Sequence, residues 1–346
     1  MKLTAASALL AVLALSSTAA QAEEKLFVYN WTDYTSPEAV KKFEAETGIK
    51  VTVDTYDSNE TLLAKLKAGA SGYDVIIPTH NFVPILISEG LVQKYDVKSL
   101  PNFANVEDRW KKSDWDPNQE YTAPFHWGTT SIAYREDLYG KKFESLGEYF
   151  KPEASVAGRV SVFKTPEEIV NMAHLYLGQE FCNSDPAQMQ KVQDLLLEQK
   201  AAVNTYSSEG VNDRLINGDT VIGAQWNGYA LKGRTEAAEA NKVLAYAYPK
   251  EGVIGWMDTM MIPSTASNVE NAKKFINFMM APENMALQSN FTGYANVIKG
   301  AEAHMTEELR TAPEIKAPAD AKIVFSWACD APSQKLIDKV WTNVLK

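Results

Sequence analysis

The chain has 346 residues, with 44 acidic and 34 basic side chains and a formal net charge of -10 at pH 7. An acidic surface repels the phosphate backbone of nucleic acids and attracts small cations, so nucleic acid is excluded as the expected partner. The 4 histidines have none of the close spacings that a metal site requires, and no cofactor is expected.

The N-terminus predicts export. Lys2 precedes an apolar run at 9–15, and a small-x-small site ends at Ala22, which together indicate a signal peptide over 1–22 that is cleaved after Ala22. A short membrane anchor is the alternative, but a span needs about 18 apolar residues. We therefore expect a periplasmic protein that is not inserted in the membrane. Its mature length suits two core-building units of about 150 residues each.

The first elements of the mature chain alternate between strands and helices. A short apolar strand is predicted at 25–31, and Ser36 with Pro37 then begins a helix as N-cap and first-turn residue. The next strand, helix and compact apolar strand are predicted at 49–56, 58–69 and 73–78. This order predicts an α/β sheet covered by helices, and such sheets bind ligands beyond the carboxyl ends of their strands.

The middle of the chain has the same pattern. Strand, helix, strand and strand are predicted at 158–165, 166–178, 217–226 and 255–263. The sequence contains no internal repeat, low-complexity tract or linker-like stretch. We therefore expect two lobes of similar construction between which the chain passes more than once, with crossings at 127–134 and 256–263.

Catalytic motifs are missing from the sequence. It contains no nucleophile elbow, HExxH, P-loop, Rossmann glycine pattern or CxxC. This favours a binding protein over an enzyme. Cys182 and Cys329 are the 2 cysteines, and in an oxidising compartment such a pair favours a structural disulfide over a redox or metal site.

Aromatic side chains recur beside carboxylates or amides. The clusters are Trp31, Asp33 and Tyr34; Trp226, Asn227 and Tyr229; Trp256 and Asp258; Tyr294 and Asn296. Aromatic faces attract ammonium groups and cover methylenes, and partly desolvated carboxylates accept charge-assisted hydrogen bonds. All the arginines lie outside these clusters, which favours a ligand without a carboxylate. The clusters predict a site for a slender alkyl diamine or triamine.

Each of these residues also has a structural interpretation. For each of the three tryptophans taken alone, packing in a core or between lobes is the favoured interpretation, while Asp33 suits the cap of a turn and Asp258 suits a satisfied acid between lobes. Glu168 has the strongest such alternative. Thr165, Pro166 and Glu168 have the spacing of a capping box, and that spacing alone favours a helix cap.

Nine segments, in order over essentially the whole mature chain, resemble the periplasmic spermidine/putrescine-binding proteins of ABC importers. They are "YNWTDYTSPE", "TGIKV", "DSNETLLAKLKAG", "YDVIIP", "PEEIV", "QWNG", "YPKEGVIGWMD", "AKKFINFMMAPE" and "GYAN". The resemblance implies a two-lobed periplasmic-binding-protein fold of type II, each lobe a mixed sheet flanked by helices, with the ligand in the cleft between lobes. It implies a first lobe of 23–131 and 257–297, and a second lobe of 132–256 and 298–346.

The resemblance also implies a set of ligand-binding residues. They are Trp31, Thr32, Asp33, Tyr34, Thr79, Asn81, Glu168, Trp226, Tyr229, Trp256, Asp258 and Tyr294. Glu168 is thereby favoured as a ligand contact, although a cap role is compatible with it.

Four positions depart from the family's pattern. Spermidine-type members have an aspartate in place of Thr165 and a tyrosine in place of Asn81, and putrescine-type members have an aspartate in place of Tyr229. Ala328 replaces a Gln or Lys. The acids Asp33, Glu168 and Asp258 remain, so the choice between diamine and triamine stays open.

The expected function is capture of a polyamine by lobe closure and delivery to an inner-membrane ABC permease and its ATPase, by a monomer. Two alternatives within binding proteins are a receptor subunit that reports amine levels to a membrane sensor and a binder of another small amine. An amine-converting enzyme is the alternative from a different class.

Overall fold

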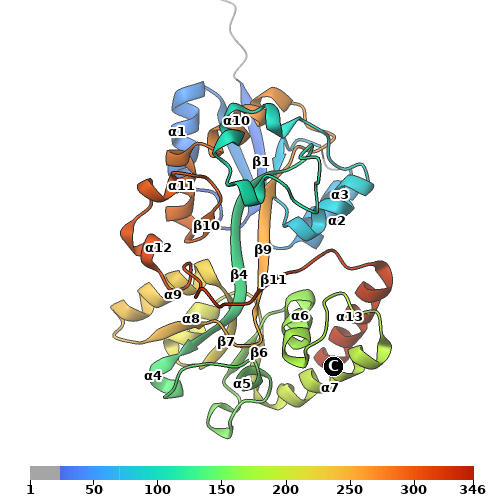
Figure 1. Ribbon diagram of the computed structural model, residues 1–346, viewed down its shortest axis with the longest axis vertical. Helices are drawn as coiled ribbons and strands as arrows, with labels where there is room; N and C mark the ends of the chain where they lie inside the picture. The colour runs from blue at the N-terminus through green and yellow to red at the C-terminus, as the bar shows by residue number, and fades with distance from the viewer. Residues whose placement is uncertain (1–23, 70) are drawn as a thin grey trace, which may run out of the picture.

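The computed structural model describes residues 24–69 and 71–346, so the predicted signal peptide 1–22 lies outside the described residues. Within that range the strands form a three-stranded and an eight-stranded sheet. Figure 1 shows two bodies stacked along the long axis, with strands β4 (Ala123–Arg135) and β9 (Val253–Met260) running from one into the other.

Parallel strands form the smaller sheet. They are β1 (Lys25–Trp31) at the centre, flanked by β2 (Lys50–Tyr56) and β3 (Val75–Ile76), and connected by α1 (Pro37–Thr47) and α2 (Asn59–Lys67). Ser36 caps α1, because its side chain accepts a hydrogen bond from the Ala39 backbone N–H. The alternation predicted for residues 25–78 is therefore confirmed.

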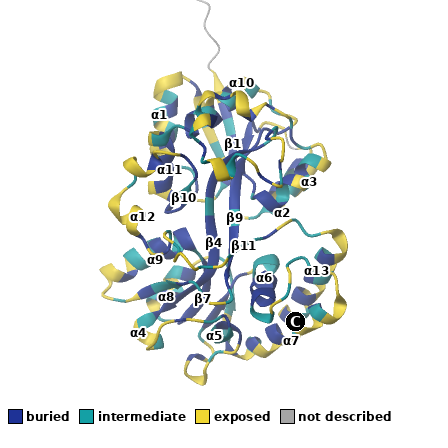
Figure 2. Cartoon of the chain, viewed as in Figure 1, coloured by how far each residue is buried: buried dark blue, intermediate teal, exposed yellow. Residues whose placement is uncertain are grey.

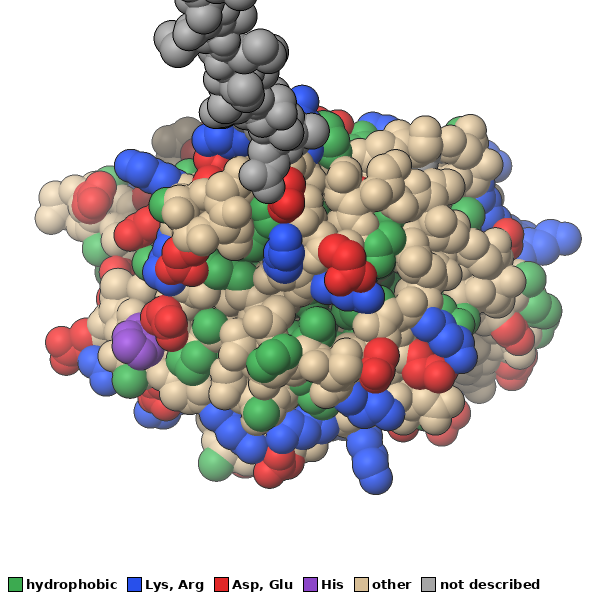
Figure 3. All heavy atoms as spheres, turned by 90° about the horizontal axis from the view of Figure 1, so that it is seen from above, with side chains coloured by type: hydrophobic (Ala, Val, Ile, Leu, Met, Phe, Trp, Pro, Cys, Tyr) green, Lys and Arg blue, Asp and Glu red, His purple; other side chains and the backbone are tan. Residues whose placement is uncertain are grey.

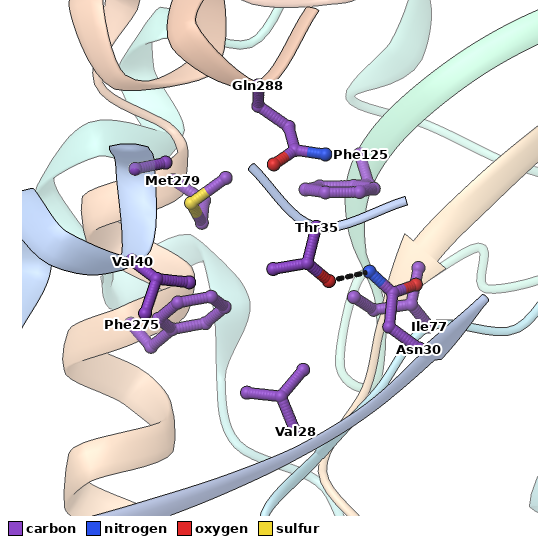
Figure 4. A pocket seen from close by; sticks show the side chains of 10 residues that line it. Val28, Asn30, Thr35, Val40, Ile77, Phe125, Phe275, Met279 and Gln288 are labelled. Atoms are coloured by element: carbon purple, nitrogen blue, oxygen red, sulfur yellow. Dashed lines mark hydrogen bonds between the residues drawn. The ribbon is translucent and has the colours of Figure 1, made fainter. Parts of the chain in front are cut away.

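Further helices complete the upper body, the name used here for β1 to β3 and the helices packed around them. The additional helices are α3 (Val83–Ser88), α10 (Val269–Met279) and α11 (Pro282–Thr292), with 3₁₀ turns at η1 (His80–Phe82), η2 (Val97–Ser99), η3 (Pro101–Asn105) and η4 (Asp108–Trp110). Their apolar faces bury Phe43 and Phe275 against Val28 of β1. The gap lined by Val28, Phe125 and Phe275 in Figure 4 is too small to admit a water molecule, so it is a packing gap and not a ligand site.

The larger sheet is mixed. Its shorter strands are β5 (Val160–Val162), β6 (Val203–Tyr206), β7 (Ile222–Trp226), β8 (Leu244–Ala247), β10 (Ala295–Asn296) and β11 (Ile323–Phe325). The strand order is β11-β9-β4-β7-β5-β6, with β8 and β10 also paired to β4. Strand β5 is parallel to β6 and β7, whereas β4 is antiparallel to β7, β8 and β9. Each body thus combines a sheet with covering helices, as the α/β fold class requires.

The lower body consists of β5 to β8 and the helices around them. These helices are α4 (Glu136–Tyr139), α5 (Gly147–Phe150), α6 (Pro166–Leu177), α7 (Pro186–Gln199), α8 (Val211–Asn217), α9 (Asn227–Glu239) and α13 (Ala331–Leu345), with 3₁₀ turns at η5 (Ala154–Val156) and η6 (Lys200–Ala202). The turn η7 (Ala301–His304) and α12 (Glu307–Thr311) follow α11 in the chain. Figure 2 shows buried residues in the middle of both bodies and along the strands that join them.

Strands β4 and β9 contribute to both cores. They pair antiparallel between Ala123 and Thr130, with an irregularity between Pro124 and Trp127. Their upper ends supply Phe125 and Met257 to the upper core, and their lower ends supply Ile132 and Ile254 to the lower core. The segments 127–134 and 256–263, predicted as crossings, overlap these strands. After α11 the chain returns to the lower body through β11, which pairs with β9 in parallel (Figure 1).

A disulfide joins Cys182 to Cys329, whose Cα atoms lie 4.9 Å apart and which are separated by 147 residues in the sequence. The bridge links the loop between α6 and α7 to the segment that precedes α13. It therefore ties the last part of the chain to the lower body.

Replacing Cys182 and Cys329 by Ser is expected to lower the free energy of unfolding by about 2–4 kcal/mol, because the bridge closes a long loop in the unfolded chain. Denaturant unfolding of both proteins measures the difference. Thiol titration of the denatured, unreduced wild type is the control, and finding two free thiols there would rule out the bridge.

No helix in the described ranges is long and apolar enough to cross a membrane. On the top face of the upper body, Lys and Arg side chains lie among Asp and Glu side chains (Figure 3). Two ion pairs that involve α10 are Lys274 with Glu24, at 3.3 Å, and Lys273 with Glu270, at 2.8 Å.

Candidate ligand-binding site

Polar and aromatic residues meet where β1 and β3 end and where β9 passes between the two bodies. Residues 32–34 follow β1 directly, and Thr79 lies just beyond β3. Thr79 forms an isolated antiparallel bridge with Asp258 of β9. Because the carboxyl ends of neighbouring parallel strands lie at the same edge of a sheet, three distant segments of the chain come together at this edge.

Asp258 is the centre of this group. Its Oδ2 accepts a hydrogen bond of 2.7 Å from the Tyr34 hydroxyl, and its Oδ1 accepts one of 2.8 Å from Thr79 Oγ1. Only 5% of the residue is exposed. Among the described residues, no lysine or arginine forms an ion pair with it. The site thus holds a buried carboxylate whose hydrogen-bond partners are neutral.

Burial determines the protonation of this carboxyl group. Desolvation raises the pKa of Asp258 from 3.8 to about 7, although the bonds from Tyr34 and Thr79 favour the charged form. The same desolvation, together with the Asp258 charge, raises the pKa of Tyr34 well above its usual value. Asp258 therefore changes its charge near neutral pH, and a cation placed beside it would favour the ionised form.

Glu168 is the second acid of the site. Its Oε1 accepts hydrogen bonds from Trp226 Nε1 at 2.8 Å and from Thr130 Oγ1 at 2.7 Å, and burial raises its pKa. The N-cap residue of α6 is Thr165, whose side chain makes no capping bond to the helix. The capping box favoured by the spacing alone is therefore wrong. Glu168 points toward the tryptophan that ends β7.

Aromatic rings link the two acids. Tyr294 lies 5.6 Å from Tyr34, 5.1 Å from Trp256 and 6.5 Å from Tyr229, measured between ring centroids. The row continues from Tyr229 to Trp226, at 5.9 Å. The rings contact one another edge-on or at a tilt, as aromatic pairs prefer. Together they form a continuous aromatic wall between Asp258 and Glu168.

Two glycines make room for these rings. A Cβ atom at Gly128 of β4 would overlap the Trp256 indole, and one at Gly228 of α9 would lie 2.6 Å from the Tyr294 ring. Real Cβ atoms essentially never come as close to other atoms as they would at these two positions. No sequence motif singled out these glycines. The only sequence feature that could have indicated these two glycines is their position inside the segments 127–134 and "QWNGY".

Three predicted site residues lie at the edge of the group. Trp31 donates from Nε1 to the Ile77 carbonyl at 2.9 Å and packs against Tyr56, with ring centroids 4.7 Å apart. Thr32 donates to the Tyr56 carbonyl at 3.3 Å. Asp33 is exposed and has a φ of 54°, a left-handed conformation that aspartate tolerates better than most residues.

A lysine that the sequence analysis missed lies near Tyr229. Lys232 Nζ lies 5.4 Å from the ring centroids of both Tyr229 and Phe291. Desolvation lowers the pKa of Lys232, and the charges of Asp33 and Glu236 oppose that shift. A hollow of about 230 Å³ adjoins Lys232 between α9, α11 and α12. The Asp33 end of the site therefore already has a positive charge nearby.

Asn81 contacts a glutamate that the sequence analysis did not select. Asn81 Nδ2 donates to the two carboxylate oxygens of Glu167, at 3.1 and 3.3 Å. Asn81 belongs to η1 of the upper body and Glu167 to the first turn of α6 in the lower body. Glu167 did not stand out in the sequence, because its neighbour Glu168 has both the capping-box spacing and the match to the family motif.

The histidines beside this group are packed into its surroundings, and the ring centroid of His126 lies 5.5 Å from that of Tyr34. His80 and His126 are buried, and desolvation lowers their pKa values to about 4 and about 3. His80 Nε2 contacts the Ser326 carbonyl at 2.6 Å, which indicates a structural role. No cluster of three or more His, Cys, Asp or Glu side chains suited to a metal ion occurs in the part of the chain that the structure describes.

Residues 38–317 match the family model of the bacterial extracellular solute-binding proteins. The chain belongs to this family of solute-binding proteins. The putrescine-binding periplasmic protein SpuD of Pseudomonas aeruginosa is 34% identical over 97% of this chain and 97% of the relative. The spermidine/putrescine-binding periplasmic protein of Escherichia coli is 32% identical over 96% of this chain and 95% of the relative. The resemblance drawn from the sequence is confirmed.

A solved structure supports the same fold. The substrate-binding protein PotD of a spermidine/putrescine ABC transporter from Streptococcus pneumoniae superimposes with a TM-score of 0.80 at 25% identity, covering 93% of this chain and 98% of that chain. The predicted two-lobed, type II solute-binding fold is therefore confirmed.

Proposed function

We propose that this protein captures a polyamine, putrescine and/or spermidine, between its two bodies and delivers it to an ABC permease. Asp258 is the observation that carries the proposal. It is a buried carboxylate, bonded by Tyr34 and Thr79, and no cationic side chain of the described residues is paired with it. A ligand ammonium would supply the missing positive charge, since a buried carboxylate is costly when it is left unpaired.

The aromatic wall supports the choice of an alkyl amine. Tyr294, Trp256 and Trp226 present rings that attract ammonium groups and cover methylenes. Four buried methylenes contribute about 3 kcal/mol, at about 0.8 kcal/mol each. Each ammonium bonded to a carboxylate adds about 1.5–3 kcal/mol. These contributions suffice for the roughly 8 kcal/mol that micromolar binding needs, after association costs are included.

Binding requires the two bodies to separate and close again. Asp258 is 5% exposed and Tyr294 is 3% exposed, so the present arrangement covers the site. We propose that the moving lobes are 23–131 with 257–297, and 132–256 with 298–346. Strands β4 and β9 are the connections about which such a hinge motion would occur. The closed surface would then be recognised by the permease.

The same proposal includes the cellular setting. The signal peptide is cleaved after Ala22, and the mature protein acts in the periplasm as a monomer. Its partners are the inner-membrane permease and the associated ATPase, and it binds amine without converting it. The periplasmic relatives named above support this setting.

Calorimetry with an amine panel tests the function. The protein is unfolded and refolded to remove any bound amine, then titrated with putrescine, cadaverine and spermidine. Stoichiometric binding with the amine recovered unchanged is the expected result. Absence of binding to all three would reject the proposal, and turnover of an amine would indicate an enzyme instead.

A further inference from the structure

The contact between Asn81 and Glu167 has features of a binding subsite. Asn81 is 7% exposed, and its Nδ2 is used by the Glu167 carboxylate. Its amide oxygen, Oδ1, is buried and has no hydrogen-bond partner among the described residues. Buried acceptors are nearly always bonded in folded proteins. A donor from outside the chain is therefore expected beside Glu167.

Glu167 itself lacks a positive partner. None of the ion pairs within the described ranges includes it, and the other charges that act on it come from Glu60 and Glu168, which are also acidic. Burial is the largest effect and raises the pKa of Glu167 to about 7, whereas the Asn81 bond opposes the shift. This corner of the site is thus rich in negative charge and poor in protein cations.

Glu167 and Glu168 point to different places. Successive helix residues are rotated by roughly 100° about the axis. Accordingly Glu168 reaches Trp226 and Thr130, whereas Glu167 reaches Asn81 of the opposite body. One helix turn therefore supplies two separate carboxylates to the junction.

We propose that Glu167 and Asn81 Oδ1 form a subsite that binds the third ammonium group of a triamine. This inference rests on the proposed polyamine function and deepens it. Asp258, Glu168 and Glu167 are three carboxylates held by neutral hydrogen-bond donors. Three ammonium groups match them in charge, whereas a diamine leaves one carboxylate unpaired. Spermidine-type members of the family have an aspartate in place of Thr165. Glu167 would supply the corresponding acid in this chain.

A simple contact between the bodies is the rival explanation. In that case Glu167 only accepts the Asn81 hydrogen bond and stabilises closure with any ligand. Glutamine at 167 keeps an acceptor for Asn81 Nδ2 but carries no charge. The substitution Glu167→Gln therefore separates the two roles.

The test measures spermidine and putrescine affinities by calorimetry at pH 8 for wild type, Glu167→Gln and Asn81→Ala. Glu239→Gln, at the exposed far end of α9, is the matched control. Glu167→Gln should weaken spermidine binding roughly 10- to 100-fold and putrescine binding less than about threefold. Asn81→Ala should shift the ratio in the same direction by a smaller factor, and the control should change neither.

Two results would overturn the subsite while leaving the proposed function intact. One is equal weakening, or no weakening, of both amines by Glu167→Gln. The other is a wild-type protein that binds putrescine but not spermidine. Failure of the wild type to bind any amine would instead reject the proposed function. Thermal unfolding of each ligand-free variant checks that the proteins being compared are folded.

Discussion

Asp258→Asn is expected to weaken amine binding about 30- to 1,000-fold while leaving the protein folded. Removing one member of a buried, hydrogen-bonded charge pair costs about 2–4 kcal/mol of binding energy. Asparagine has nearly the same shape: its Oδ1 can accept one of the bonds from Tyr34 and Thr79, and its Nδ2 can donate to the other hydroxyl oxygen, so the main loss is that of the charge. Calorimetric titration with putrescine and spermidine measures the effect. An unchanged affinity would remove Asp258 from the site.

The same substitution should stabilise the ligand-free protein at pH 8. The folded-state pKa of Asp258 is about 7, above the unfolded value of 3.8. The folded state thus binds the proton more tightly, and the wild type loses stability as pH rises from about 4 to about 7. Asparagine has no carboxyl group to ionise, so the variant does not lose this stability as the pH rises. Asp320→Asn, at an exposed position, is the control and should leave both affinity and stability unchanged.

Amine affinity is expected to fall by roughly 100-fold between pH 8 and pH 5. Below the pKa of about 7, the Asp258 carboxyl in the free protein is neutral and must lose its proton before it pairs with an ammonium. Each pH unit below that value therefore costs about tenfold in affinity. Alkyl ammonium groups stay charged throughout this range, since their pKa values lie near 10.

Titrations at several pH values, in buffers of equal ionic strength, measure this dependence. Glu168 and Glu167 also have raised pKa values, so they would steepen the slope rather than reverse it. Asp258→Asn should make the slope shallower, because it removes one of the titrating groups. A wild-type affinity that is constant from pH 8 to pH 5 would contradict the assignment of a buried carboxylate to the site.

Local sequence features predicted the upper sheet well. The strands at 25–31 and 49–56 and the Ser36 cap follow from alternation and from capping chemistry, which act within a few residues. The last strand was less well delimited, since β3 covers only Val75 and Ile76 of the predicted 73–78. Its hydrogen bonds depend on distant partners, namely β1 and, through an isolated bridge at Ile76, Met261.

Glu168 illustrates where local reasoning failed. The spacing of residues 165–168 fitted a capping box, yet the carboxylate bonds Trp226 and Thr130 instead. Both partners lie far away in the sequence, on β7 and β4. No local pattern contains that information, and only the family resemblance favoured the ligand role before the structure was known.

The sequence by itself determined the α/β class, the strand-end position of the aromatic and acidic residues, and the amine-like chemistry that those residue types favour. These properties depend on composition and on short-range periodicity. The tertiary structure decided which acids share the site. It buried Asp258 between Tyr34 and Thr79, left Asp33 exposed near Lys232, and placed Glu167 against Asn81. The physical reason is that desolvation and charge pairing depend on groups brought together from distant segments, which local sequence does not specify.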